Sequence, residues 1–218
     1  MSARIALIHA TRAAIGPVET AFAGLWPAAE IWNLLDESLS REIDAAGELT
    51  QALTDRFIDL GTYVKDTGVD GILFTCSAFG PAIDECARRF DIPAMKPNQA
   101  LLETALEGGG TIGLLATHPP TLPNMKAQLE MLAEETGRRV NVRAVLAEGA
   151  WAHLGAGDQA AHDAVVIETA KQLSGCDCIA LGQFSMAQLA DAIQAAVTPP
   201  VLSSPHTAVA KMKALLGD

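Results

Sequence analysis

The chain has 218 residues, half of them hydrophobic, which allows a sizeable core in one large or two small domains. Its formal net charge of −11 disfavours nucleic acid and anionic membranes as partners, since both select basic surfaces. No apolar run of about 18 residues is free of charges or helix breakers, and the first apolar run ends at His9 without the long core of a signal peptide. We therefore expect a cytoplasmic protein with no nucleic-acid or membrane partner.

Hydrophobic patterning predicts strands and helices in alternation along the chain. Strands are expected at residues 4–8, 30–35, 71–74, 94–95, 111–115, 141–146, 178–181 and 201–202. Helices are expected at residues 18–25, 48–67, 81–90, 98–106, 122–136, 159–173, 187–197 and 206–216. This alternation predicts an α/β fold with parallel sheets.

The second half of the chain repeats the pattern of the first half at a constant offset of 107 positions. The matched pairs are Ile5 and Ile112, Asp70 and Asp177, Ile72 and Ile179, Asp84 and Asp191, and Pro93 and Pro200. Because the pairs fall in equivalent strand and helix contexts, we infer an internal duplication. The alternative is that α/β patterning makes unrelated hydrophobic strands look alike.

Cys76 has the setting of a reactive thiol, because it follows the predicted strand 71–74 and precedes a helix. Pro81 suits the first turn of that helix, so the amides from Ser77 to Gly80 are expected to be unpaired within it. Such amides can bind a carboxylate, and their partial positive charge predicts a lowered pKa for the thiol. The alternative is a buried, inert cysteine.

The remaining cysteines are not expected to take part in chemistry. They form no disulfide framework in a chain of this size, and the Cys-x-Cys pair lacks the second ligand pair of a zinc site. We therefore predict no metal site, and we interpret the three as small buried hydrophobic residues: Cys86, Cys176 and Cys178.

Ligands of parallel sheets collect outside the carboxyl ends of the strands, and this rule selects further polar residues. Thr11 and Thr117 follow the first strand of each half, where their hydroxyls could clamp a carboxylate or serve as helix N-caps. His118 and His206 precede helices and could donate a proton or simply be solvated. His9 could orient a loop or take part in chemistry.

Two further features of these loops bear on function. Asp36 and Glu37 could contact an amino group, although a solvated turn or helix cap explains them as well. At the position that repeats Cys76, the second half carries Gln183. The predicted site is therefore doubled but has a single thiol.

The residues at these strand ends resemble those of the aspartate/glutamate/hydantoin racemase superfamily, which also includes arylmalonate decarboxylase and maleate isomerase. The resemblance covers nearly the whole chain and rests on four segments: 5–11, Asn33 to Ser38, the Thr75-Cys76-Ser77 turn, and 181–187. It implies two similar flavodoxin-like α/β lobes with the site in the cleft between them. The implied lobes are residues 1–97 with 206–218, and 98–205. Neither pyridoxal phosphate (PLP) nor a metal is implied, so we expect no cofactor.

Carried over by position, Cys76 corresponds to the first-lobe thiol of the racemases and Gln183 to the second. An amide does not exchange protons at neutral pH as a thiol does, so the symmetrical two-thiol mechanism is doubtful. The decarboxylase pattern needs one thiol but has it in the second lobe. The maleate isomerase pattern has a first-lobe nucleophile but pairs it with a second-lobe thiol.

These comparisons predict a cofactor-independent, PLP-independent isomerase of racemase or epimerase type. It would act at the carbon next to the carboxylate of a small amino or organic acid, with Cys76 and Gln183 as catalytic residues. The expected substrate-binding residues are His9, Thr11, Thr75, Ser77, Ala78, Thr117, His118, Phe184, Ser185 and His206. The alternatives are a decarboxylase, a cis–trans isomerase, or a non-catalytic two-lobed carboxylate-binding protein. Helix 159–173 could also present an apolar face to a second copy, giving a homo-oligomer.

Overall fold

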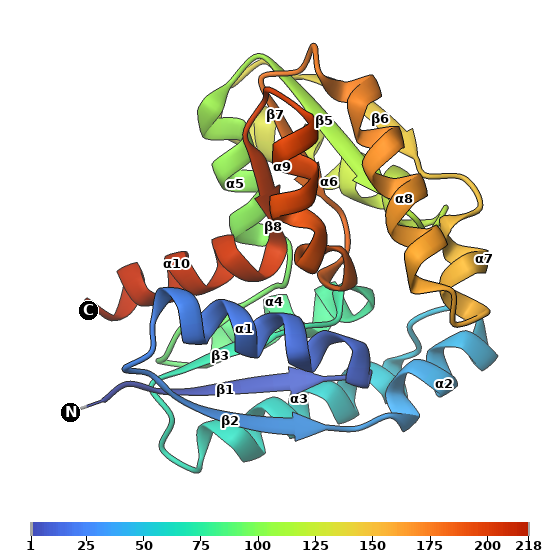
Figure 1. Cartoon of the computed structure of the whole chain (residues 1–218). Helices are drawn as coiled ribbons and strands as arrows, with labels where there is room; N and C mark the ends of the chain where they lie inside the picture. The colour runs from blue at the N-terminus through green and yellow to red at the C-terminus, as the bar shows by residue number, and fades with distance from the viewer. Residues whose placement is uncertain (1, 218) are drawn as a thin grey trace. The chain divides into compact units, whose positions relative to one another are not determined.

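The computed structural model describes residues 2–217 and divides the chain into two compact units. Unit 1 comprises Met1–Gln99 and Ala208–Asp218, and unit 2 comprises Ala100–Thr207. Each unit contains one four-stranded sheet in which every pairing is parallel (Figure 1).

The sheet of unit 1 has the strand order β2-β1-β3-β4. Its strands are β1 (Arg4–His9), β2 (Glu30–Leu35), β3 (Gly71–Phe74) and β4 (Ala94–Met95). Its helices are η1 (Arg12–Ala14), α1 (Ile15–Leu25), α2 (Ser38–Ala46), α3 (Gln51–Lys65), η2 (Ser77–Phe79), α4 (Gly80–Arg89) and most of α10 (Ser204–Leu216).

The sheet of unit 2 has the equivalent order β6-β5-β7-β8. Its strands are β5 (Thr111–Ala116), β6 (Asn141–Leu146), β7 (Cys178–Leu181) and β8 (Val201–Ser203). Its helices are α5 (Gln99–Gly108), α6 (Thr121–Glu135), α7 (Ala150–Gly155), α8 (Gln159–Ala170), η3 (Lys171–Leu173), η4 (Phe184–Leu189) and α9 (Ala190–Ala196).

The central strands of the two sheets are aligned in the same way. An aspartate just before the third strand of each unit accepts a hydrogen bond from the backbone at the start of the first strand. Asp70 accepts from the Arg4 amide and Asp177 from the Thr111 amide, each at 2.7 Å. The predicted fold class of two similar parallel α/β lobes is therefore confirmed. The common ancestry of the lobes remains an inference.

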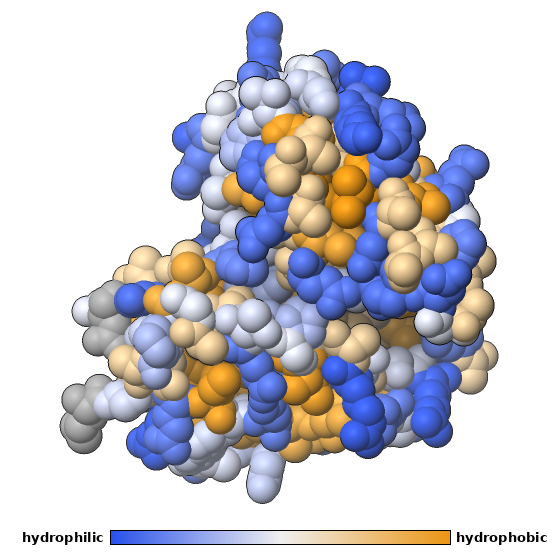
Figure 2. Space-filling view, in the orientation of Figure 1, coloured by the Kyte–Doolittle hydropathy of each residue, from blue (hydrophilic) through white to orange (hydrophobic). Residues whose placement is uncertain are grey.

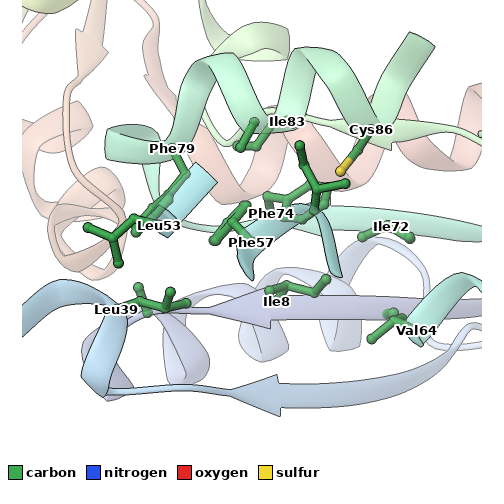
Figure 3. Close-up of a cluster of buried hydrophobic side chains, with 14 of the residues drawn as sticks. Ile8, Leu39, Leu53, Phe57, Val64, Ile72, Phe74, Phe79, Ile83 and Cys86 are labelled. Carbon is green, nitrogen blue, oxygen red and sulfur yellow. The ribbon is translucent and has the colours of Figure 1, made fainter. Parts of the chain in front are cut away.

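One core cluster of unit 1 lies between the sheet and helices α2, α3 and α4, and residues of α1 and α10 are buried as well. Phe57 of α3 stacks on Phe79, with ring centroids 4.2 Å apart, and meets Phe74 of β3 at 5.1 Å (Figure 3). Phe79 belongs to η2, the turn between β3 and α4. Because a packed core restrains its side chains, the buried Phe79 ring anchors this turn.

In unit 2, separate hydrophobic clusters pack different faces of the sheet. Leu115, Ile179 and Leu181 pack with α8 and α9, whereas Ile112 and Leu114 pack with α5 and α6. The side chains of a strand alternate between its two faces, so this division is expected of a sheet covered on both sides.

The observed elements differ from the predicted ones mainly in short helices. All eight predicted strands are present within one residue of their expected ends. Helices α2 and α7 were not predicted. Helix α2 is amphipathic, with Leu39 buried and Ile43 packed partly buried against the core, but its nine residues make this stripe short. Helix α7 is six residues long and only its Ala150 is buried.

On the face drawn in Figure 2, hydrophilic residues surround separate hydrophobic areas. The large hydrophobic side chains exposed among the described residues are Leu25, Trp32, Tyr63, Met131, Trp151 and Leu215. Within residues 2–217, every helix is too short or too polar to traverse a lipid bilayer. The homo-oligomer stays a prediction.

Candidate active site

The thiol of Cys76 lies where the sequence predicted it, at the carboxyl end of the buried strand β3. Cys76 has an extended backbone, with φ −119° and ψ 113°, and is the N-cap residue of η2. Helix α4 follows η2 directly and has Pro81 in its first turn. The turn therefore presents Cys76 half-buried and its neighbours Ser77 and Ala78 exposed.

Burial raises the pKa of the Cys76 thiol, although a hydrogen bond from the Ala78 backbone amide partly opposes that rise. The negative charge of Asp44 on α2 raises the pKa further. The expected lowering of the Cys76 pKa is thus wrong. The helix amides act in the predicted direction, but η2 contributes a single short turn and desolvation of the thiolate outweighs it.

Cys76 still differs from the other three cysteines, which are all buried and free of disulfides. Burial raises the pKa of Cys86 to about 11 and that of Cys178 to about 11, and it also raises the pKa of Cys176. Cys86 belongs to the core of unit 1 (Figure 3). Their interpretation as small buried hydrophobic residues agrees with these positions.

We expect a limiting amount of iodoacetamide to label Cys76 before the other three cysteines, because only Cys76 is partly exposed. Thiolate is the reactive form, so the raised pKa predicts a labelling rate that keeps climbing past pH 9.0, the ordinary thiol value. Peptide mapping at a series of pH values measures the order in which the cysteines are labelled and the pH dependence of the Cys76 rate. A plateau below pH 8 would show that the folded protein stabilises the thiolate instead.

His9 is fully buried at the end of β1, and both of its ring nitrogens are hydrogen-bonded. Nδ1 lies 2.9 Å from the Thr75 hydroxyl, and Nε2 lies 2.9 Å from Oδ1 of Asn33. Asn33 in turn donates from Nδ2 to Glu19 at 2.8 Å. Burial lowers the pKa of His9, although the bond to Asn33 and the charge of Glu19 oppose this. Both ring nitrogens of His9 are therefore engaged by partners within the protein.

Thr11 and Thr75, also expected to bind substrate, have structural partners. The exposed Thr11 caps η1, accepting a hydrogen bond of 3.4 Å from the Ala13 amide. Thr75 is buried, and besides meeting His9 it lies 3.2 Å from the carbonyl oxygen of Ile8. The N-cap alternative for Thr11 is thus observed.

In unit 2, Gln183 occupies the position equivalent to that of Cys76. It follows β7 with an extended backbone, φ −137° and ψ 143°, and is the N-cap residue of η4. Three donors converge on its Oε1: the Thr117 amide at 2.8 Å, the Thr117 hydroxyl at 3.0 Å and the His118 amide at 3.3 Å. We call these three donors the Gln183 cradle.

The cradle fixes the orientation of the Gln183 amide. Backbone amides can only donate, so the atom they meet must be the oxygen, and the NH₂ group is turned away from them. Gln183 as a whole is half-buried. The Thr117 hydroxyl, expected to hold a substrate carboxylate, donates its proton to Gln183 instead.

The other predicted residues of unit 2 lie at the same ends of its strands. The His118 ring packs on Trp151 of α7, with centroids 4.8 Å apart. Phe184 is buried and Ser185 half-buried in η4. His206 is exposed at the start of α10, and its Nδ1 lies 2.6 Å from the Ser203 hydroxyl.

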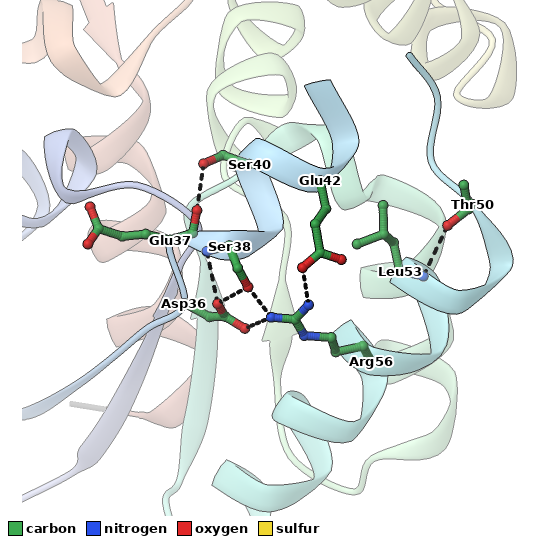
Figure 4. A network of polar contacts seen from close by, with 8 residues as sticks. All are labelled: Asp36, Glu37, Ser38, Ser40, Glu42, Thr50, Leu53 and Arg56. Atoms are coloured by element: carbon green, nitrogen blue, oxygen red, sulfur yellow. Dashed lines mark hydrogen bonds and ion pairs between the residues drawn. The ribbon is translucent and has the colours of Figure 1, made fainter. Parts of the chain in front are cut away.

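Asp36 is engaged in a network of structural contacts (Figure 4), whereas the Glu37 carboxylate forms a surface ion pair with Arg12 at 2.8 Å. Asp36 accepts from the Ser38 amide at 3.0 Å and pairs with Arg56, which also bonds Glu42 at 2.8 Å. Burial raises the pKa of Asp36, but the hydrogen bonds from Ser38 and Arg56 outweigh burial and lower it overall. The turn-and-cap interpretation accounts for this pair.

Four residues near the loops were not predicted: Glu19 and Asn33 in the His9 network, Asp44 near Cys76, and Trp151 against His118. Each comes from an element distant in sequence from its partner. Among residues 2–217, no group of three or more His, Cys, Asp or Glu side chains is arranged so that it could hold a metal ion.

Similar folds are found among racemases. Allantoin racemase from Klebsiella pneumoniae superposes with a TM-score of 0.75 over 99% of this chain and 88% of its own, at 18% identity. Glutamate racemase from Francisella tularensis, in complex with D-glutamate, gives 0.67 over 99% of this chain and 81% of its own, at 16% identity. An uncharacterised protein of Schizosaccharomyces pombe is 28% identical over 179 residues, covering 79% of this chain and 71% of its own.

The fold and the paired strand-end loops thus define a two-lobed α/β protein of the racemase type. The family model of Asp/Glu/hydantoin racemases matches residues 27–212. The chain belongs to this family. The predicted resemblance is confirmed, and the isomerase class is the one that the family supports.

Proposed function

We propose that this protein is a cofactor-independent enzyme that moves a proton at the carbon next to the carboxylate of a small amino or organic acid. One observation carries the proposal. Cys76 and Gln183 occupy the same place in the two units, each an extended N-cap residue directly after the third strand. We propose that the Cys76 thiol transfers the proton and that the Gln183 amide binds the substrate.

Cys76 is proposed as the acid and base. Its raised pKa keeps the thiol mainly protonated at neutral pH, which suits a group that delivers a proton to a carbanion or enediolate. Thiolate formation, needed for proton removal, becomes easier as pH rises. This balance favours a second candidate reaction, decarboxylation of a malonate-type substrate, because loss of carbon dioxide creates the enediolate without a base.

Binding of the carboxylate is proposed to involve the exposed turn after Cys76. Ser77 and Ala78 are exposed there, and their amides lie at the start of η2, where donors can stabilise an oxyanion. In unit 2, the NH₂ group of Gln183 would donate to a second oxygen of the substrate. His118, Ser185 and His206 are the remaining polar side chains proposed to reach it.

The competing proposals differ in what they do to the substrate. A maleate-type cis–trans isomerase would use Cys76 as a nucleophile. A non-catalytic carboxylate-binding protein would have lost its activity with the second thiol. Only the binding protein predicts affinity without chemistry.

The test is a screen in heavy water of malonates, maleate, aspartate, glutamate, hydantoins and allantoin. Nuclear magnetic resonance (NMR) reports deuterium uptake, decarboxylation and isomerisation together. We expect deuterium to enter at the carbon next to a carboxylate or equivalent carbonyl, in protein treated with chelator and free of pyridoxal phosphate. Binding of a screened compound with no exchange and no conversion would instead identify a binding protein.

A further inference from the structure

The hydrogen bonds of His9 form a directed chain from Glu19 on α1 to the residue next to Cys76. An ionised carboxylate can only accept, so Asn33 must turn its NH₂ group to Glu19 and its oxygen to His9. His9 then has to donate from Nε2. In neutral imidazole the other nitrogen is an acceptor, so the Thr75 hydroxyl must donate to Nδ1.

We propose that His9 is a positioning residue, which fixes the Thr75 hydroxyl and thereby the turn that carries Cys76. Thr75 has two acceptors for its one proton, Nδ1 of His9 at 2.9 Å and the Ile8 carbonyl oxygen at 3.2 Å. When the neutral ring is protonated on Nε2, its Nδ1 is the closer of these two acceptors. Burial supports this state, because it lowers the pKa of His9.

This series of hydrogen bonds gives Glu19 a role, although Asn33, His9 and Thr75 stand between it and Cys76. With a carboxylate at position 19, only one orientation of Asn33 is allowed. A neutral amide at the same position can donate or accept, so it permits Asn33 to flip and present NH₂ to Nε2 of His9. The proton of the ring then moves to Nδ1, and the Thr75 hydroxyl must donate to the more distant Ile8 carbonyl oxygen instead.

The first measurement is the ¹⁵N spectrum of the histidines at neutral pH, with His9 assigned by comparison with His9→Gln. We expect a bound proton on Nε2 of His9 and an unprotonated, hydrogen-bonded Nδ1. A ring protonated on Nδ1, or on both nitrogens, overturns the proposal. This measurement requires no knowledge of the substrate.

The informative variant is Glu19→Gln, because replacing buried His9 itself strips partners from Thr75 and Asn33 and endangers folding. We expect mixed tautomers of His9 and severalfold faster alkylation of Cys76, while Cys86 in the core below stays unlabelled. Labelling of Cys86 in parallel would indicate general destabilisation and contradict a specific role. Glu30→Gln, which removes the same charge at the start of β2, serves as the control. It should change neither the tautomer of His9 nor the alkylation rate of Cys76.

The catalytic part of the inference rests on the proposed function. With an active substrate, Glu19→Gln should lower kcat about tenfold, as a misaligned acid–base group does, and leave KM within about twofold. An unchanged kcat with altered tautomers would show that His9 does not position Cys76 for catalysis. If no substrate is found, the spectra and alkylation rates still decide the structural part.

Discussion

Cys76→Ala is expected to abolish turnover while the protein stays folded. Cys76 is half-buried and only packs against the edge of the unit 1 core, so losing its sulfur leaves little cavity. Positioned acid–base groups contribute about 10² to 10⁴-fold, and the loss should be at least of that order because no other thiol is exposed. Circular dichroism and thermal unfolding establish the fold, and product formation by NMR measures the rate.

The matched control is Cys178→Ala, which removes a buried thiol at the amino end of β7, opposite the end that carries Gln183. It should retain turnover with a modest loss of stability. Cys76→Ser keeps the shape of the side chain but raises its pKa far above neutrality, so it should be nearly as inactive as alanine. A Cys76→Ala protein that works at the normal rate would remove Cys76 from the mechanism.

Gln183→Cys is expected to convert a single-handed reaction into a racemising one. With Cys76 as the only proton carrier, the unmodified protein should give product of one handedness and racemise aspartate or glutamate weakly or not at all. A second thiol supplies an acid for the other face, and the gain should reach about 10² to 10⁴-fold. Chiral chromatography of products formed in heavy water measures both handedness and exchange.

The cradle makes this substitution favourable, because removing Gln183 frees the Thr117 and His118 amides and the Thr117 hydroxyl. The freed donors carry partial positive charge, which favours the thiolate of the new cysteine. Gln183→Ser frees the same donors without an acid of suitable pKa and should not racemise. Should the unmodified protein already racemise an amino acid rapidly, His118, Ser185 and His206 would be the next candidates for the second face.

The fold was predictable from sequence because its strands carry a strong local signal. Ile5 to Ile8 and Ile112 to Leu115 are uninterrupted apolar runs, and their repetition implied two lobes of the same order. Helix α2 is short, has one fully buried residue and is also held by hydrogen bonds from Arg56 of α3 to Ser38 and Glu42 (Figure 4). Contacts with a side chain from another helix leave no signal in the local sequence.

For the site, the sequence predicted which loops matter but not what each side chain does there. The position of Cys76 after β3 followed from the strand pattern. Its pKa could not be deduced, because it depends on burial and on Asp44 from another helix. Likewise, the function of His9 depends on Asn33 and Glu19, and hydrogen-bond direction is settled only when all three partners are in place.

Because of the Gln183 cradle, the side chain at position 183 can change without a change in the backbone of its loop. Two of the cradle's three donors are main-chain amides, which remain when any side chain is replaced. A glutamine oxygen or a glutamate carboxylate has the length to accept from them, and a shorter thiolate is favoured by their partial positive charge. Single substitutions can therefore exchange one for another while β5 and β7 stay in register. Enzymes with different reactions could therefore diverge at this residue without first having to evolve a new backbone.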